Sequence, residues 1–167
     1  MAIQFRNVLR PSDIPVLTEI VRATGRFSAA EVEIAVELLN ENLTRGEASD
    51  YSVTVAEVDG ALAGYTCCGP IPCTISSFDL YWIVVDPRVQ GRGVGRALMR
   101  EFESQVERRG GTHVFIDTSL RGDYAPTRSF YERCGYQLEA RLADFYGPGD
   151  GKAVFSKRLG GARQTTA

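Results

Sequence analysis

A glycine-rich turn between a strand-like and a helix-like segment constrains the fold of this chain more than any other feature. Residues 90–96 read Gln-Gly-Arg-Gly-Val-Gly-Arg. Residues 80–87 before them, Leu-Tyr-Trp-Ile-Val-Val-Asp-Pro, are mostly β-branched and aromatic and end in a turn signal. Apolar residues after the turn recur at the spacing of one helix face: Val94, Ala97, Leu98, Phe102 and Val106. Glycines in such a turn let backbone N–H groups approach a ligand, and a helix N-terminus favours negative charge. The sequence therefore predicts an anion-binding turn.

The charges around the turn support this prediction. No acidic residue occurs between Asp86 and Glu101. Four arginines occupy the same interval: Arg88, Arg92, Arg96 and Arg100. A helix start normally attracts carboxylates, because its unpaired N–H groups carry partial positive charge. Arginines there are unfavourable unless an anion joins them. The alternative is that they are solvated surface residues beside a glycine turn.

Two common phosphate-binding loops do not fit the turn. A dinucleotide fingerprint needs a third glycine where Arg96 stands, and a nucleoside triphosphate loop ends in Gly-Lys-Ser/Thr, which is absent here. The turn instead resembles the pyrophosphate loop of the GNAT superfamily of N-acetyltransferases. That loop reads Gln/Arg-x-x-Gly-x-Gly/Ala, and Gln90, Gly93 and Gly95 match its fixed places. Residues 129–136, Ser-Phe-Tyr-Glu-Arg-Cys-Gly-Tyr, resemble the second signature of the family at the expected separation.

Composition narrows the class of protein further. A length of 167 residues suits one domain, and a net charge of −2 offers no general basic surface for nucleic acid. No apolar run is long enough to span a membrane and no signal-peptide core opens the chain, so we expect a cytoplasmic protein that binds neither membranes nor nucleic acid. The four cysteines lack metal-ligand spacing and we expect buried, reduced thiols. The single histidine, His113, excludes a multi-histidine metal site.

Hydrophobic periodicity and turn signals predict eleven elements in the order β-α-α-β-β-β-α-β-α-β-β. The expected strands lie at 3–9, 51–58, 61–68, 77–85, 112–118, 136–142 and 152–159. Two helices are expected to begin after caps at Ser12 and Ser28. Two more are expected over residues 94–109 and 125–134. This is the element order of the GNAT fold, so the resemblance spans residues 3–159. It implies an α/β (α+β) fold with a mixed central sheet, helices on both faces, and splayed fourth and fifth strands. We expect a single domain over residues 1–159 and a disordered tail over residues 160–167.

The resemblance implies acetyl-CoA as the acetyl donor and no metal. In the family, the pantetheine arm pairs with the strand backbone, here that of Ile83, Val84 and Val85. Gln90 would stand at the entry of the loop. The pyrophosphate would rest on the backbone N–H groups of Gly91, Arg92, Gly93, Val94, Gly95 and Arg96. The side chains of the strand residues are expected to be core, so only their backbone would serve the donor.

Tyr131 matches the family tyrosine that protonates the departing CoA thiolate. A phenol has a pKa of about 10 and a thiol one of about 8.5, so a phenol can pass its proton to a thiolate. The alternative is a buried tyrosine that packs the short helix against the sheet. One departure bears on this helix: many members carry an asparagine seven residues earlier that helps to hold CoA, and Tyr124 stands there.

Asp79 falls where several members carry a strand carboxylate that deprotonates the amine through water. Strand alternation places Asp79, Tyr81 and Ile83 on one face. A carboxyl with a pKa of about 3.9 is poorly matched to an ammonium of about 10.4, so Asp79 is either a base with a shifted pKa or a group that orients the amine. A solvated carboxylate is the alternative. Tyr81 and Asp117 are weaker substitutes.

The acceptor is less constrained than the donor. Asp144, Phe145 and Tyr146 resemble the aromatic turn with which members that act on peptides clamp the backbone, and Tyr81 is a further candidate contact. An ordinary hairpin corner with packed aromatic rings is the alternative. The leading hypothesis is an acetyl-CoA-dependent N-acetyltransferase that moves an acetyl group to a primary amine by direct attack in a ternary complex. Its partner would be a small-molecule amine or a peptide, and it would act as a monomer or homodimer. The alternatives are a protein N-terminal or lysine acetyltransferase and, in a different class, a non-catalytic CoA-binding sensor.

Overall fold

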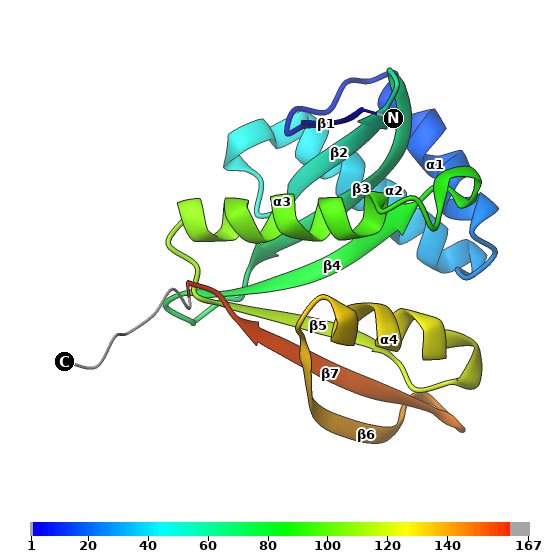
Figure 1. Ribbon diagram of the computed structural model, residues 1–167, viewed down its shortest axis with the longest axis vertical. Coiled ribbons are helices and arrows are strands. Elements are labelled where there is room, and N and C mark those ends of the chain that lie inside the picture. The colour runs from blue at the N-terminus through cyan, green and yellow to red at the C-terminus, as the bar shows by residue number, and fades with distance from the viewer. Residues whose placement is uncertain (1, 161–167) are drawn as a thin grey trace. The chain divides into compact units, whose positions relative to one another are not determined.

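The computed structural model describes residues 2–160, which fall into two compact units. The first unit contains the chain up to Gly69 and then Tyr81–Phe102, and the second contains Pro70–Leu80 and the chain from Glu103 onward. The observed order of strands and α-helices is the predicted β-α-α-β-β-β-α-β-α-β-β (Figure 1). The expected tail lies outside the described residues, except for Gly160.

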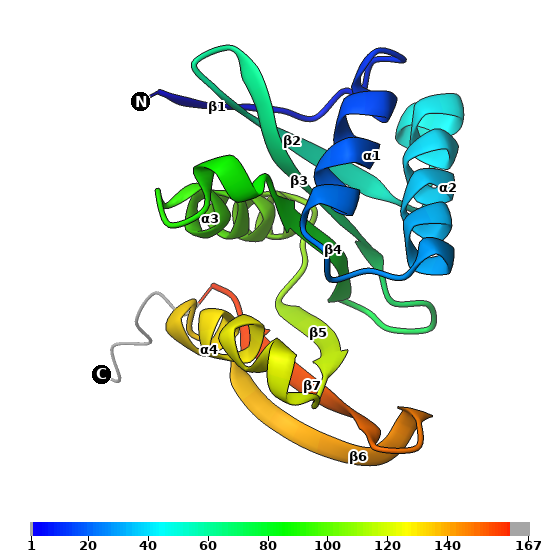
Figure 2. The ribbon, with the colours of Figure 1, turned by 90° about the vertical axis from the view of Figure 1, so that its right-hand side faces the viewer.

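The first unit is built on the β1-β2-β3-β4 part of the sheet. Its elements are β1 (Ile3–Arg6), α1 (Asp13–Ala23), α2 (Ala29–Arg45), the 3-10 turn Gly46–Ala48, β2 (Ser52–Val58), β3 (Ala61–Pro70), the end of β4 (Ser77–Val85), the 3-10 turn Pro87–Val89 and the start of α3 (Val94–Arg108). The β1–β2 and β2–β3 pairs are antiparallel. Helices α1 and α2 lie side by side against one face of these strands (Figure 2).

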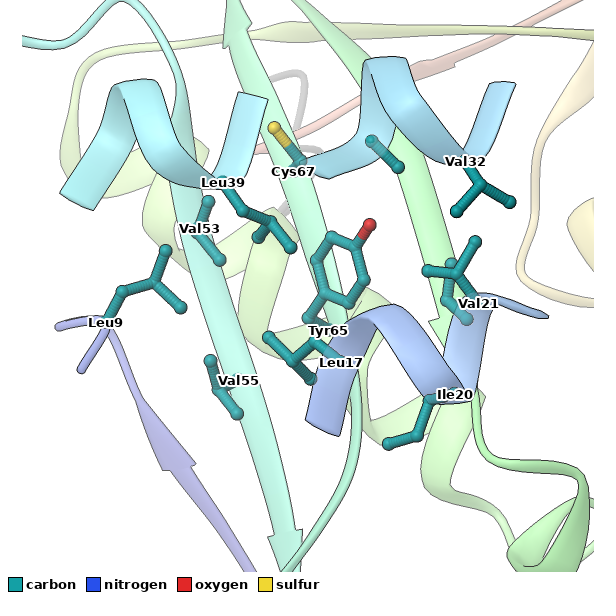
Figure 3. Packing of buried hydrophobic residues seen from close by; sticks show 12 residues of the cluster. Leu9, Leu17, Ile20, Val21, Val32, Leu39, Val53, Val55, Tyr65 and Cys67 are labelled. Carbon is teal, nitrogen blue, oxygen red and sulfur yellow. The ribbon is translucent and has the colours of Figure 1, made fainter. Parts of the chain in front are cut away.

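Interlocking apolar side chains explain why these elements pack. Tyr65 and Cys67 are two residues apart on β3 and belong to the same core cluster, and the Tyr65 ring lies between the two helices (Figure 3). Buried residues of α1, α2 and β2 surround them, including Leu17, Val21, Leu39, Val53 and Val55. The predicted capping box begins α2: the Ser28 hydroxyl accepts from the Glu31 N–H, and the Glu31 carboxylate accepts from the Ser28 N–H. Local capping and tertiary burial therefore agree on where α2 begins.

The second unit contains the β4-β5-β7-β6 part of the sheet. Its further elements are β5 (His113–Ser119), the 3-10 turn Gly122–Tyr124, α4 (Ala125–Arg133), β6 (Gln137–Gly147) and β7 (Asp150–Arg158). Strands β4 and β5 are parallel, and their ladder joins Ser77–Asp79 to His113–Phe115 in three residue pairs. Strand β4 continues to Val85, beyond the three residue pairs of this ladder. The β5–β7 and β6–β7 pairs are antiparallel.

Four local predictions were wrong. Strand β1 ends at Arg6 rather than at residue 9. Ser12 makes no side-chain cap, because its backbone is helical (φ −67°, ψ −17°) and the third helical residue is Pro15, which has no N–H to donate. Strand β6 does not end at residue 142 but continues to Gly147. Its register with β7 shifts after residue 142, and pairing resumes between Gly147 and Asp150 at the turn. Of the four cysteines expected to be buried, Cys73 is exposed in a loop and Cys134 is partly exposed.

Candidate functional site

The glycine turn has the backbone conformation that its sequence requires. Gly91 and Gly93 have φ values of 77° and 85°, a region that L side chains rarely adopt. A Cβ atom at either position would meet nothing within 4 Å. The two glycines are therefore needed for the path of the chain rather than to avoid a clash, and the space beside each of them is open to a ligand.

The turn leads directly into the N-terminus of α3. The first helical hydrogen bond runs from the Ala97 N–H to the Gly93 carbonyl at 3.0 Å. The N–H groups of Val94, Gly95 and Arg96 come before it and therefore belong to the open end of the helix. The first helical turn carries no acidic side chain, while the buried Val94 side chain anchors the helix start in the core. This end can accept an anion through backbone N–H groups and the helix dipole.

Two side chains of the motif hold the turn itself. The Arg88 guanidinium binds the buried Asp86 carboxylate at 2.6 Å, and its hydrogen bonds hold the pKa of Asp86 below the usual range. The charge of Arg88 is therefore compensated by Asp86. Arg92 and Arg96 are exposed beside the turn. The Gln90 side-chain amide donates to the Val85 carbonyl at 3.1 Å. Gln90 thus ties the turn to the end of β4.

The last residues of β4 have core side chains, as expected. Val84 packs in the cluster with α1 and α2, whereas Ile83 and Val85 pack against the cluster that contains Val94. On the β3 side the backbones are close, because a Cβ at Gly64 would lie 2.2 Å from the Val84 carbonyl oxygen. The ladder to β5 covers only residues 77–79. The backbone of Ile83–Val85 lies beyond that ladder and suits pairing with an extended ligand.

Asp79 lies in the second unit, at the end of the β4–β5 ladder. It is half-buried and pairs in register with Phe115, two residues before Asp117 on β5. Burial raises the pKa of Asp79, and the nearby Asp117 carboxylate raises it further, while the Lys152 ammonium opposes both effects. A raised pKa makes Asp79 a better base than an ordinary aspartate.

Tyr131 is buried on α4 in the second unit. Its ring packs against Phe155 of β7, with 5.8 Å between ring centroids, and against Tyr136 at 6.3 Å. Burial raises the pKa of Tyr131 above its ordinary value, and the neighbouring Cys134 and Tyr124 contribute to the same direction. The phenol therefore stays protonated at physiological pH. Tyr124, where an asparagine is common, is half-buried under the Arg121 guanidinium at 5.3 Å.

The three predicted acceptor contacts divide between the units. Phe145 and Tyr146 are exposed on β6, with rings edge to face and 5.0 Å between centroids. Tyr81 belongs to the first unit, where its exposed ring meets Tyr51 edge-on at 5.6 Å.

The sequence did not single out Lys152, which ion-pairs with Asp117 at 2.7 Å. The scarcity of lysine was the one signal in the sequence that could have drawn attention to this residue, because the chain contains two lysines, Lys152 and Lys157.

No helix among residues 2–160 is long and apolar enough to cross a membrane. Within the same residues, no group of three or more His, Cys, Asp or Glu side chains is suited to holding a metal ion.

Comparisons with known proteins agree with this geometry. A family model described as the acetyltransferase (GNAT) domain matches residues 49–138, more than half of the chain. A crystal structure from Desulfovibrio desulfuricans, of a protein assigned to the GNAT family of acetyltransferases, superposes with a TM-score of 0.91 at 42% identity and covers 94% of this chain and 99% of that one. The ribosomal protein bS18-alanine N-acetyltransferase of Escherichia coli K12 is 25% identical over 86% of this chain and 88% of its own. An aminoglycoside 6′-N-acetyltransferase complexed with coenzyme A shares the fold, with a TM-score of 0.73 at 19% identity over 95% of this chain and 97% of that one.

Proposed function

This chain belongs to the GNAT family of N-acetyltransferases. We propose that it moves the acetyl group of acetyl-CoA to a primary amine, which attacks the thioester directly in a ternary complex. The observation that carries the proposal is the turn at Gly91 and Gly93, whose open space and helix N-terminus suit a pyrophosphate. Bound acetyl-CoA supplies the activated thioester. The cytoplasm is the proposed location.

The turn and the end of β4 take the donor in this proposal. Backbone N–H groups from Gly91 to Arg96 hold the pyrophosphate, with the exposed Arg92 and Arg96 adding positive charge. The backbone of Ile83–Val85 pairs with the pantetheine arm. Gln90 acts by bracing the turn against Val85. Such fixed positioning supplies a large part of the rate of a two-substrate reaction.

Tyr131 is the proposed acid of the reaction and donates its phenolic proton to the departing thiolate. Burial raises the pKa of Tyr131, which by itself makes the phenol a weaker acid. Burial disfavours a thiolate in the same way, so a thiol in a similarly buried place also has a raised pKa. In this proposal the two pKa values rise together, which would keep the phenol and the thiolate matched for proton transfer.

Asp79 is the proposed base or orienting group for the acceptor amine. Its half-buried position and its neighbour Asp117 raise its pKa toward that of an amine. A carboxylate in this place can take the proton through a water molecule or hold the amine by a charge-assisted hydrogen bond.

A peptide amine or a small-molecule amine is the proposed acceptor. The bS18 relative is named for the alanine of a ribosomal protein, and the coenzyme A-bound neighbour is named for aminoglycosides. The exposed aromatic pair of Phe145 and Tyr146 supports a peptide, because flat rings pack well along an extended backbone.

The test is release of free thiol from acetyl-CoA in the presence of a panel of amines and N-terminal peptides. We expect release with at least one acceptor, and we expect Tyr131→Phe to lower kcat by about a hundredfold or more with little change in KM. Phenylalanine keeps the ring packing against Phe155, so thermal melting serves as the control for folding. Binding of acetyl-CoA without release from any acceptor would favour the non-catalytic sensor. Full activity of Tyr131→Phe would refute its assignment as the acid.

A further inference from the structure

Lys152 of β7 is held by two different kinds of contact. Its Nζ atom lies 2.7 Å from the Asp117 carboxylate of β5 and 4.0 Å from the centroid of the Phe145 ring of β6. The Lys152 side chain is 15% exposed, so most of the aliphatic chain is buried while Asp117 stays half in water. An ammonium between a carboxylate and an aromatic face is attracted by both. Its position is therefore defined, unlike that of a solvated surface lysine.

The strand register places this ammonium on the face that carries Asp79. Asp79 pairs with Phe115 in the β4–β5 ladder, and Asp117 is two residues further along β5, on the same face. Lys152 pairs with Ser119 in the β5–β7 ladder, which makes it the diagonal neighbour of Asp117 on that face. Lys157 points to the opposite face, where it binds Glu103 of α3 at 2.8 Å. Only one of the two lysines thus lies beside the proposed acceptor contacts.

We propose that Lys152 is a specificity-determining residue, which disfavours acceptors that carry a second positive charge and favours acceptors with one amino group, such as the N-terminus of a peptide. The inference rests on the proposed function and on Phe145 as an acceptor contact. It names the substrate class that the site prefers.

Two physical effects act in the same direction. The fixed ammonium repels a second cation on the acceptor directly. It also occupies the Asp117 carboxylate and the Phe145 face, the two groups that would otherwise attract that cation. Asp79 then remains for the reacting amine alone. A polycationic amine is disfavoured by both effects, whereas a peptide with one free amine meets only the repulsion that every acceptor shares.

The experiment compares acceptors that differ by one charge, using thiol release from acetyl-CoA by the full chain. One pair is an alanine-initiated peptide with norleucine or arginine at its second position, and the other is n-butylamine with putrescine. The measured quantity is the ratio of kcat/KM for the charged acceptor to that for its neutral partner. Because both values come from the same sample, a change in the folded fraction cancels.

The variants predict changes of opposite sign. Lys152→Met keeps the length of the side chain without the charge and should raise the ratio about two- to fivefold, the size expected for a partly exposed charge pair. Asp117→Asn leaves the ammonium without its partner carboxylate and should lower the ratio. Lys152→Arg should keep the wild-type ratio. Lys157→Met, which removes the lysine of the opposite face, should also keep it.

The result also separates this inference from the function on which it rests. Turnover with ratios that stay within twofold of wild type in both Lys152→Met and Asp117→Asn would overturn the role of Lys152 alone. Loss of the preference in Lys157→Met as strongly as in Lys152→Met would overturn it as well, because the effect would then be one of net charge. Absence of turnover with every acceptor would overturn both proposals.

Discussion

At the scale of single residues, burial changes the acid–base chemistry of Asp79 and Tyr131 in the same direction. Both pKa values lie above their ordinary range, and loss of solvation is the largest cause for each. For a phenol this keeps the proton on, and for a carboxyl it makes the charged form less favourable. A carboxylate that is kept charged in such a place lowers the stability of the fold, which is a common property of functional sites.

Replacement of Asp79 by asparagine should therefore stabilise the protein at neutral pH while it lowers acetyl transfer. The folded pKa of Asp79 is raised, so its contribution to stability is fully present below the unfolded pKa of about 3.9 and is lost as pH rises through the folded pKa. The asparagine side chain carries no charge at any pH. The free energy of unfolding of Asp79→Asn should exceed that of wild type at pH about 7, and the gap should close as pH falls toward about 4.

Chemical denaturation at a series of pH values measures this difference. Asp117→Asn is the matched control, because the exposed Asp117 carboxylate has the Lys152 ammonium as its partner and its removal should bring no comparable gain. Equal stability of Asp79→Asn and wild type across the whole pH range would show that desolvation of Asp79 is unimportant.

At the scale of elements, the turn between β4 and α3 was predictable because its requirements are local. Positive φ values at Gly91 and Gly93 and the absence of acidic residues from the first turn of α3 follow from neighbouring residues. The apolar spacing that begins at Val94 predicts which face of α3 is buried. The extension of β6 past residue 142 was not predictable in the same way. It depends on pairing with β7, which resumes after a register shift.

Gly93→Val should damage the turn in two measurable ways. A β-branched residue at a φ of 85° costs about 1–2 kcal/mol of folding stability, and its side chain would enter the open space where the pyrophosphate is proposed to bind. We expect affinity for coenzyme A, measured by calorimetry, to fall about tenfold or more. Gly122→Val is the control, because Gly122 also has open space around it but no positive φ. Comparable affinity in the two variants would contradict binding at this turn.

At the scale of the whole molecule, the residues with proposed roles are distributed over both compact units. The donor turn and Tyr81 belong to the first unit, while Asp79, Tyr131 and the aromatic pair on β6 belong to the second. A ligand that binds only the folded state adds to the free energy of unfolding by mass action.

Coenzyme A should thus raise the melting temperature of the chain in a concentration-dependent way. At about a hundredfold excess over Kd the added stability is about 2.7 kcal/mol. Differential scanning calorimetry across a range of coenzyme A concentrations measures this, with adenosine alone as the control for binding that does not involve the pyrophosphate. An unchanged melting temperature at millimolar coenzyme A would argue against the proposed donor.

The sequence by itself determined the glycine turn, the two family signatures, the capping box of α2 and the order of the elements, because each depends on residues that are close together in the chain. The surroundings of the proposed site residues depend instead on contacts between distant parts of the chain. Arg88 is neutralised by Asp86, Gln90 braces the turn, and Lys152 is held between Asp117 and Phe145. The charges near Asp79 belong to Asp117 of β5 and Lys152 of β7, and the pairing register of these strands brings them together. No local sequence pattern specifies that register.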